Sequence, residues 1–446
     1  MKKNKLSSTQ IILLSFLITI LFGSVLLSLP ISSATGERLP YIDALFTATS
    51  ATCVTGLVTV TTAHAWSIFG QAVILILIQI GGLGVITVMS VFMIIAGKKM
   101  SLGNRMLVMD SFNINTLSEI VVFIKKVVIG SLIIEFAGAL LYMTVFIPKF
   151  GLKGIWISVF NAVSAFCNAG MDIISDTSLY EYVSNPIINI VTNVLIIMGG
   201  IGFIVWWDII RIVKNKHTRH FKYLSLHSKI ALTSTAFLLI LGSVAIFIFE
   251  YNNPATIGSL SIFDKIQASI FQSVTTRTAG FASVPQESLT VPSTLICMLL
   301  MFIGGSPVGT AGGIKTVTFF VISATALSVI KARKNTVLYN RRLSDVAVKK
   351  AIAVFSTSFA ILLISTLLLS VSCGASLTDI LYETVSATAT VGLSRNLTSS
   401  LNLFGKIIII ITMYFGRVGP ISLAIAFRGS EKANTVTDPV EEISIG

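Results

Sequence analysis

Four short polar loops hold the residues whose types and spacing could coordinate a dehydrated cation. Each ends in a glycine, and the glycines recur roughly every 110 residues, which indicates internal repeats. We name them loop 1 (Val54, Thr55, Gly56), loop 2 (Asn168, Ala169, Gly170), loop 3 (Thr278, Ala279, Gly280) and loop 4 (Thr390, Val391, Gly392). Backbone carbonyls can replace an ion's lost water. Glycine reaches the backbone angles that aim successive carbonyls inward, so the sequence predicts a filter of four loops.

The residues around the glycines repeat as well. Loops 1, 2 and 4 follow a Ser-Ala pair, whereas Val274 and Thr275 replace it before loop 3. Loops 1 and 4 are also preceded by an acid, Asp43 or Asp379, which we interpret as the N-cap or first-turn charge of a short helix. The carboxyl end of such a helix adds partial negative charge next to the loop, which favours a cation.

The composition places these loops in a membrane protein. Charged residues make up 11% of the chain and the mean hydropathy is +0.89. Apolar stretches near the ~20 residues needed to cross hydrocarbon recur throughout. Each loop lies between two such stretches, which we call the first and the second span of that repeat. The first spans are predicted at 11–30, 127–147, 229–250 and 350–373, and the second spans at 68–96, 187–213, 292–330 and 404–427.

The expected fold is therefore an all-α integral membrane protein. It has eight transmembrane helices, arranged as four helix–pore loop–helix repeats around a pseudo-fourfold pore. The repeats cover residues 1–100, 101–215, 216–334 and 335–446, the last including the C-terminal tail.

The distribution of charge orients the chain in the bilayer. The net charge is +13, and most of the 32 Lys and Arg residues fall between spans on one side. This positive-inside asymmetry predicts cytoplasmic termini and extracellular pore loops, and it argues against a nucleic-acid partner. The apolar run at 11–30 is too long for a signal peptide, whose apolar region has about 7–15 residues, so we interpret it as an uncleaved span.

A second glycine signature recurs in the second spans. In the first two repeats, Gly81-Gly82-Leu83-Gly84 and Gly199-Gly200-Ile201-Gly202 are interpreted as close helix packing. The third repeat breaks the pattern over the segment that we name the inner loop: Gly304, Gly305, Ser306, Pro307, Val308, Gly309, Thr310, Ala311, Gly312, Gly313, Ile314 and Lys315. In the fourth, Arg417 replaces glycine.

The inner loop cannot continue a stable helix, because it contains five glycines and a proline. Irregular backbone at membrane depth must be buried in protein or line a water-filled cavity. It is not a nucleotide-binding loop, since Ile314 separates Gly313 from Lys315.

The quadruple arrangement resembles the superfamily of potassium transporters that contains TrkH, KtrB and the plant HKT proteins. The resemblance runs over nearly the whole chain, from Asp43-Ala-Leu-Phe46 to Gly416-Arg417-Val418-Gly419-Pro420, and is closest to the membrane subunits of bacterial Ktr systems. It implies a potassium-selective pore with K⁺ at the carbonyls of loops 1 to 4. It also implies that the inner loop is an intramembrane gate and that Arg417 projects toward the same constriction.

The same resemblance implies partners and a location. The chain would form a homodimer in the bacterial plasma membrane on a cytoplasmic regulatory ring of the KtrA or KtrC type. ATP, ADP and NAD would bind only that ring, and no cofactor would be attached covalently. Sodium would stimulate transport. The tail Pro439–Gly446 would pack against the other protomer.

Some alternatives stay open. Lys315 and Arg417 could raise an electrostatic barrier to cations, or Arg417 could simply bond to loop carbonyls. The chain could also be a sodium-coupled secondary symporter with a midplane site at the broken helix. An enzyme is disfavoured, since only Glu135, Lys315 and Arg417 are titratable near mid-membrane, and Glu135 has no assigned partner. The four cysteines form no CxxC pair; Cys53 and Cys167 are interpreted as packing residues.

Overall fold

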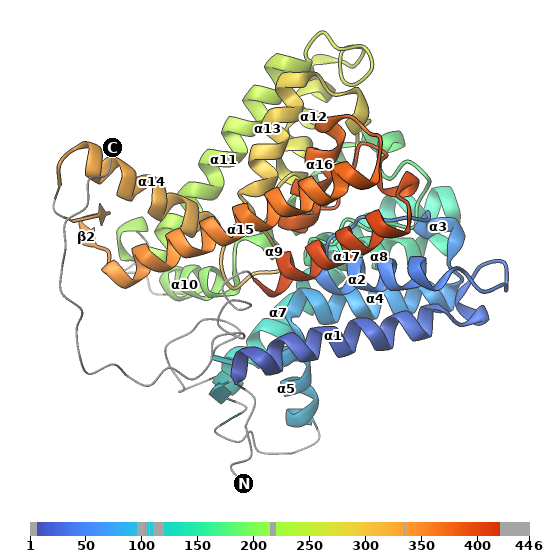
Figure 1. The fold of residues 1–446 in the computed structure, drawn as a ribbon, viewed down its shortest axis with the longest axis horizontal. Coiled ribbons are helices and arrows are strands. Elements are labelled where there is room, and N and C mark those ends of the chain that lie inside the picture. Colours follow the sequence, from blue (N-terminus) through green and yellow to red (C-terminus); the bar gives the residue numbers. More distant parts are fainter. Residues whose placement is uncertain are drawn as a thin grey trace.

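The computed structural model describes residues 7–95, 103, 105–106, 108–109, 120–214, 220–333 and 335–419, and most of them are helical (Figure 1). Up to residue 214 the principal helices are α1 (Ser8–Leu27), α2 (Tyr41–Cys53), α3 (Thr62–Ala65), α4 (Ile68–Leu83), α5 (Val85–Ile95), α7 (Ile120–Phe150), α8 (Lys153–Cys167), α9 (Pro186–Gly200) and α10 (Phe203–Lys214). After residue 220 they are α11 (Leu226–Glu250), α12 (Ile262–Thr275), α13 (Val291–Phe302), α14 (Thr316–Ile330), α15 (Asp345–Ser372), α16 (Leu377–Ala389) and α17 (Leu403–Val418).

Short elements connect these helices. Single 3₁₀ turns are η1 (Pro30–Ser32), η2 (Tyr180–Tyr182), η4 (Phe221–Tyr223), η5 (Gln286–Ser288) and η6 (Thr398–Ser400). A minimal antiparallel hairpin pairs β1 (Val337–Leu338) with β2 (Arg341–Arg342).

The predicted first spans are long single helices, α1, α7, α11 and α15. Serine side chains cap three of them: Ser7, Ser225 and Ser344 each accept a hydrogen bond from the first helical turn, which satisfies backbone donors that otherwise lack a partner. Their outward faces are strongly apolar and exposed, as at Phe22 and Val371. Such faces suit lipid as solvent.

Short helices precede the four loops, as expected. Asp43 and Asp379 both lie in first helical turns, of α2 and α16, but neither is the cap. Pro40 holds the N-cap position of α2, and Ser376 caps α16 through its side chain. Asp43 instead pairs with Lys406 of α17 at 2.6 Å, which ties the first short helix to the last long one.

Two of the predicted second spans are sharply bent rather than continuous. α4 and α5 meet at 96°, and α9 and α10 at 97°. The break falls at the last glycine of each signature, where Gly84 and Gly202 have φ of 87° and 96°. Glycine alone adopts such angles without a Cβ penalty. The spans predicted at 68–96 and 187–213 are therefore each interrupted by a bend that the sequence did not reveal.

The third and fourth second spans follow the prediction more closely. α13 ends at Phe302 and α14 begins at Thr316, so the segment between them is non-helical. α17 ends at Val418, and Gly419 has φ of 94°. The predicted continuation of this span to 427, and the C-terminal tail, lie outside the described residues.

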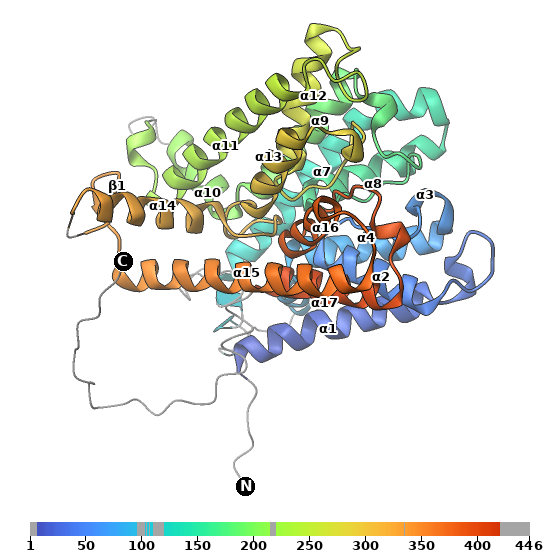
Figure 2. The ribbon, with the colours of Figure 1, turned by 45° about the horizontal axis from the view of Figure 1, so that its top comes forward.

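The helices pack in a closed cycle. Each long first helix contacts the short helix that follows it: α1 with α2, α7 with α8, α11 with α12 and α15 with α16. Each short helix also packs on the second span that precedes its own long helix: α8 on α4, α12 on α9 and α16 on α13. α2 closes the cycle on α17, and Figure 2 shows α15, α17 and α1 lying side by side.

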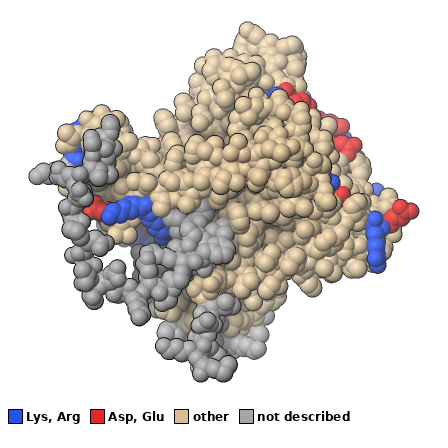
Figure 3. Space-filling model, viewed as in Figure 1, with Lys and Arg blue, Asp and Glu red and all other residues tan. Residues whose placement is uncertain are grey.

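The length and apolar composition of the described helices indicate a multi-pass membrane protein. Three helices are long and apolar enough to cross a membrane, namely Thr9–Leu27, Leu226–Glu250 and Asp345–Ser372, and the two bent pairs pass the same test as pairs. Figure 3 shows a broad belt without charged side chains on one face, with Lys, Arg, Asp and Glu gathered at opposite edges of the drawn surface. This is the pattern expected for a protein surrounded by hydrocarbon between two aqueous layers.

Candidate functional site

The four predicted loop glycines lie against one another in a closed ring. A Cβ built on Gly56 would stand 3.3 Å from the Cα of Gly170, and one on Gly170 would stand 2.7 Å from that of Gly280. The series continues from Gly280 to Gly392 at 3.1 Å and from Gly392 back to Gly56 at 2.9 Å. The structure thus brings together all four loops that the sequence predicted to act jointly.

One carbonyl oxygen of each loop lies next to the glycine of a neighbouring loop. The Cβ position of each glycine is directed at the carbonyl oxygen of the residue before the next glycine: Ala169, Ala279, Val391 and Thr55 in turn. There is no room for a side chain at any of the four glycines, so the ring can close only with glycine.

The loop backbones alternate in hand. The first residue of each loop has positive φ, at 56° for Val54, 60° for Asn168, 69° for Thr278 and 50° for Thr390. The glycines are also positive, at 98°, 65°, 83° and 100°, and the residues between are not. In an extended strand successive carbonyls point to opposite sides; left-handed residues at alternate positions turn them toward one side. Left-handed Val and Thr are uncommon and strained, so the packing around the loops must hold them.

The carboxyl ends of the short helices supply part of that restraint. Val54 caps α2, and Thr55 N donates to Ser50 O at 2.8 Å. Loops 2 and 4 repeat this arrangement. It is a Schellman-type termination, which normally uses glycine at the left-handed position. Here the left-handed residue that ends the helix is also the first residue of the loop, so the helix end sets the backbone conformation with which the loop begins.

The serine of the repeated Ser-Ala pair fixes the loop from behind. Ser50 Oγ accepts from Gly56 N at 3.0 Å, and Ser386 Oγ accepts from Gly392 N at the same distance. Ser164 uses its hydroxyl differently and donates to Met171 O at 2.5 Å. The sequence showed the serine repeat without revealing this function.

Loop 3, which lacks Ser-Ala, is braced by a shifted residue. Thr275 Oγ1 donates to Phe281 O at 2.6 Å, the same carbonyl position that Ser164 reaches in loop 2. The hydroxyl therefore lies one residue nearer the glycine in this repeat. The substitution noted in the sequence keeps the contact.

The second-span glycines pack against the ends of the short helices. Cβ atoms at Gly81, Gly199 and Gly416 would clash with the carbonyl oxygens of Thr52, Phe166 and Thr388 respectively. Cys167 fills the space beside Gly82, and Cys53 is also buried. The predicted packing role of Gly81, Gly199 and the two cysteines is confirmed.

The inner loop lies directly against three of the four loops. Thr310 Oγ1 donates to Phe166 O at the end of α8 at 3.1 Å and lies 3.3 Å from the side-chain amide of Asn168 in loop 2. Gly312 N donates to Thr278 Oγ1 in loop 3 at 3.2 Å. A Cβ on Gly312 would clash with Thr390 Oγ1. The inner loop therefore contacts the first residue of each of loops 2, 3 and 4.

Hydrogen bonds to neighbouring backbone hold the inner loop in place. Ser306 N donates to Gly200 O at 2.8 Å and Thr310 N donates to Gly199 O at 3.1 Å. Val308 O accepts from Phe203 N at 2.8 Å, which joins the loop to the start of α10. These polar groups of the irregular backbone thus find hydrogen-bond partners inside the protein, as is required within a membrane.

Both predicted cations reach backbone carbonyls at this place. Arg417 donates to Thr310 O and to Gly81 O, each at 2.5 Å, so it links the inner loop to α4. Lys315 Nζ donates to Ala311 O within its own loop at 2.5 Å. The bond to a loop carbonyl that one of the two alternatives for Arg417 expected is therefore present, whereas the electrostatic barrier stays a prediction.

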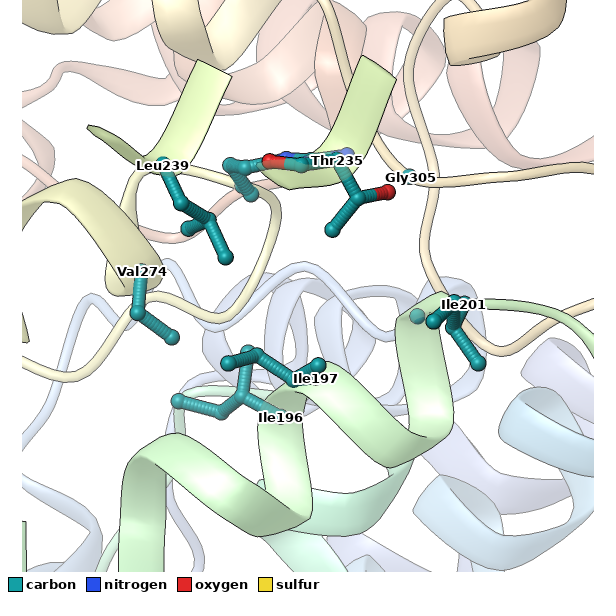
Figure 4. A pocket seen from close by; sticks show the side chains of 9 residues that line it. Ile196, Ile197, Ile201, Thr235, Leu239, Val274 and Gly305 are labelled. Atoms are coloured by element: carbon teal, nitrogen blue, oxygen red, sulfur yellow. The ribbon is translucent and has the colours of Figure 1, made fainter. Parts of the chain in front are cut away.

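Arg277 was not singled out by its sequence pattern. It stands immediately before loop 3, is 5% exposed, and donates to Gly304 O at 3.1 Å and Thr235 O at 3.3 Å. It also lines a pocket in which Ile196 and Ile197 lie opposite Leu239, Thr235 and Gly305 (Figure 4). A charged residue beside a predicted filter loop was the available signal.

Glu135, left without a partner by the sequence, has one. Gln79 Nε2 donates to its two carboxyl oxygens at 3.0 and 3.2 Å. Gln79 Oε1 in turn accepts from Cys167 Sγ at 3.5 Å. This buried chain joins α7, α4 and the end of α8, and it lies behind loop 2.

Fold and site define a multi-pass membrane protein with four backbone loops meeting in a ring. The sequence profile of the TrkH family, described as cation transport protein, matches residues 6–436. The chain belongs to this family, whose members are transporters and not enzymes.

Relatives extend over the same length. The chain is 42% identical to Ktr system potassium uptake protein B of Bacillus subtilis, with 95% of this chain and 94% of that protein covered. It is 38% identical to the potassium/sodium uptake protein NtpJ of Enterococcus hirae, over 100% and 98%. The crystal structure of the potassium transporter TrkH from Vibrio parahaemolyticus matches with a TM-score of 0.73 at 18% identity, covering 96% and 86% of the two chains, and so shares the fold.

Proposed function

We propose that this chain conducts potassium ions across the bacterial plasma membrane through the ring of loops 1 to 4. The four predicted repeats, at 1–100, 101–215, 216–334 and 335–446, would contribute eight spans around a pseudo-fourfold axis. The observation that carries the proposal is the closed glycine ring with its alternating backbone. A dehydrated cation needs replacement ligands, and carbonyl oxygens aimed at one axis supply them.

Potassium is the ion proposed, for two reasons. All four ring positions are glycine, so the loops can approach one another closely without side chains between them. The similar protein of Bacillus subtilis is named as a potassium uptake protein.

The inner loop and Arg417 would form the gate of this pore. The loop lies against loops 2, 3 and 4, and Arg417 fastens it to α4. Opening would require the loop to leave these partners. Lys315 and Arg417 would add a positive potential beneath the ring while the loop is closed.

The assembly we propose follows the Ktr systems. The chain would form a homodimer above a cytoplasmic nucleotide-binding ring, with both termini in the cytoplasm and loops 1 to 4 toward the outside. Several relatives are named as proteins of a Ktr system, which supports partner subunits. ATP, ADP and NAD would act through that ring, and sodium would stimulate transport.

A sodium-coupled symporter is the second candidate, because the Enterococcus hirae relative is named for potassium and sodium uptake. The two functions differ in the charge carried per potassium ion. A pore gives one elementary charge per K⁺, and a symporter gives more. Current measured together with isotope flux separates them.

The test of the proposed function is potassium uptake in cells that lack their own uptake systems. Gly392→Ser adds a side chain where Cβ would stand 2.9 Å from Gly56 Cα, at φ of 100°. We expect uptake to fall by about tenfold or more, since left-handed strain alone costs roughly 1–2 kcal/mol. Gly374→Ser is the matched control, because nothing lies within 4 Å of its Cβ position. Equal uptake by the two variants would refute the filter assignment.

A further inference from the structure

A buried acid stands behind loop 4 and is not explained by ion conduction through the ring. Glu383 lies on α16, is 0% exposed, and receives a hydrogen bond from Ser394 Oγ at 2.6 Å and another from Thr398 Oγ1. Both donors belong to the segment that follows Gly392. The carboxyl therefore joins α16, the short helix before loop 4, to the irregular segment after it, which ends in η6.

Loop 3 has a counterpart made of different side chains. Gln272 on α12 and Gln286 exchange two hydrogen bonds, at 2.6 and 3.2 Å. Gln272 stands three residues before the bracing Thr275, as Glu383 stands three before Ser386. Gln286 and Thr398 occupy the same place after their glycines. The same link is thus built twice, once from an amide pair and once from an acid and hydroxyls.

Loops 1 and 2 lack this link. The equivalent positions are Thr47 and Asn161, buried at 1% and 2% exposure. In the part of the chain that the structure describes, neither the Thr47 hydroxyl nor the Asn161 amide has a hydrogen-bond partner. Among the described residues, this additional link is therefore present behind loops 3 and 4 and absent behind loops 1 and 2.

Further hydrogen bonds connect the third and fourth repeats beside loops 3 and 4. Tyr382, next to Glu383, donates to Gln286 Oε1 at 2.8 Å. Arg395 donates to Asp379 at 2.7 Å and to Gln286 O at 2.8 Å. Loops 3 and 4 are thereby held to one another through the segments that follow them.

We propose that Glu383 is a positioning residue of the filter: by anchoring the segment after Gly392 it holds the loop 4 carbonyls at the spacing that discriminates K⁺ from Na⁺. This inference rests on the proposed function. Selectivity depends on the number and field strength of carbonyls around the ion. If the segment after Gly392 is released, the carbonyls of loop 4 can move inward toward the smaller Na⁺.

The test measures the ratio of K⁺ to Na⁺ uptake by the full chain, together with its amount in the membrane and its melting temperature. Glu383→Ala removes both hydrogen bonds to the segment after Gly392. We expect the ratio to fall about tenfold, which corresponds to a change of about 1.4 kcal/mol in the preference for K⁺ over Na⁺. Glu383→Gln can still pair with the hydroxyls, as Gln272 pairs in loop 3, and should keep a near-native ratio. Ser394→Ala combined with Thr398→Val should reproduce Glu383→Ala and serves if that variant does not accumulate.

Thr47→Val is the matched control, because it removes a hydroxyl at the equivalent position without removing a hydrogen bond, and its ratio should be native. A native ratio in both Glu383→Ala and the double variant overturns the proposal. So does an equal loss in Glu383→Gln and Glu383→Ala, which would mean that charge, not anchoring, is the active property. If Gly392→Ser still reduces uptake in those cases, the proposed function stands and only the role of Glu383 falls.

Discussion

Replacing Arg417 is the most direct test of how the inner loop is held. Its guanidinium bonds to Thr310 O in the loop and to Gly81 O on α4, each at 2.5 Å. A hydrogen bond to a charged group contributes about 1.5–3 kcal/mol. Because 1.4 kcal/mol is a factor of ten, loss of the Thr310 bond should favour the released loop by about tenfold, taking the lower end. Arg417→Gln should raise flux by that factor.

The assay is rubidium or potassium flux into proteoliposomes that contain the chain without cytoplasmic subunits. Arg417→Lys separates the two effects of the residue. Lysine keeps the positive charge, but its single ammonium cannot reproduce the fork that reaches two carbonyls. If the hydrogen bonds hold the loop, Arg417→Lys should also be leaky, although less than Arg417→Gln, since the charge still opposes cations.

The control is Lys149→Gln, which removes an exposed cation that is paired with Glu181. Its flux should equal that of the native chain. Shortening the inner loop should raise flux as Arg417→Gln does. If Arg417→Gln and the shortened loop both give native flux, neither residue nor loop acts as a gate, and the reasoning is refuted.

Three further predictions concern the supports of the ring. Ser386→Ala removes the acceptor of Gly392 N. It should lower the free energy of unfolding by about 1 kcal/mol and reduce the ratio of K⁺ to Na⁺ uptake. Ser370→Ala, at an exposed position of α15, is the control in both thermal melts and uptake. Asp43→Asn leaves the largely buried Lys406 without its partner and should cost about 2–3 kcal/mol, below the range for a fully buried pair; an unchanged melting temperature contradicts it. Glu135→Gln keeps an acceptor for Gln79, so uptake should be native, whereas lost uptake would assign the acid a role in transport.

The ring itself could be predicted from the sequence because its signal is fourfold. A single Thr-Val-Gly means little, but four glycines between membrane-length stretches leave few structures that satisfy all of them. The break at the inner loop was equally visible, since glycine and proline cannot propagate a helix. Both predictions depended on local chemistry that repeats or fails within a few residues.

The bends and the buried partners could not be predicted in the same way. Gly81 and Gly84 are the same residue type only three positions apart. Gly81 allows the carbonyl oxygen of Thr52 to approach closely, whereas Gly84 lies at the 96° bend between α4 and α5. Only the tertiary packing decides between these roles. The pairing of Glu135 with Gln79 likewise joins residues that are distant in sequence. The shift from serine to Thr275 in loop 3 concealed a conserved contact because its spacing from the glycine changed.

The inner loop occupies the space against loops 2, 3 and 4, and this has a consequence for how such a molecule can be encoded. Four identical subunits would each bring a copy of that segment to one small volume, and the copies would collide. A single polypeptide can carry such a segment in one repeat only, while the corresponding parts of the first two repeats are bent helices. One chain with four unequal repeats therefore has room for an off-centre segment that four identical subunits could not all place there.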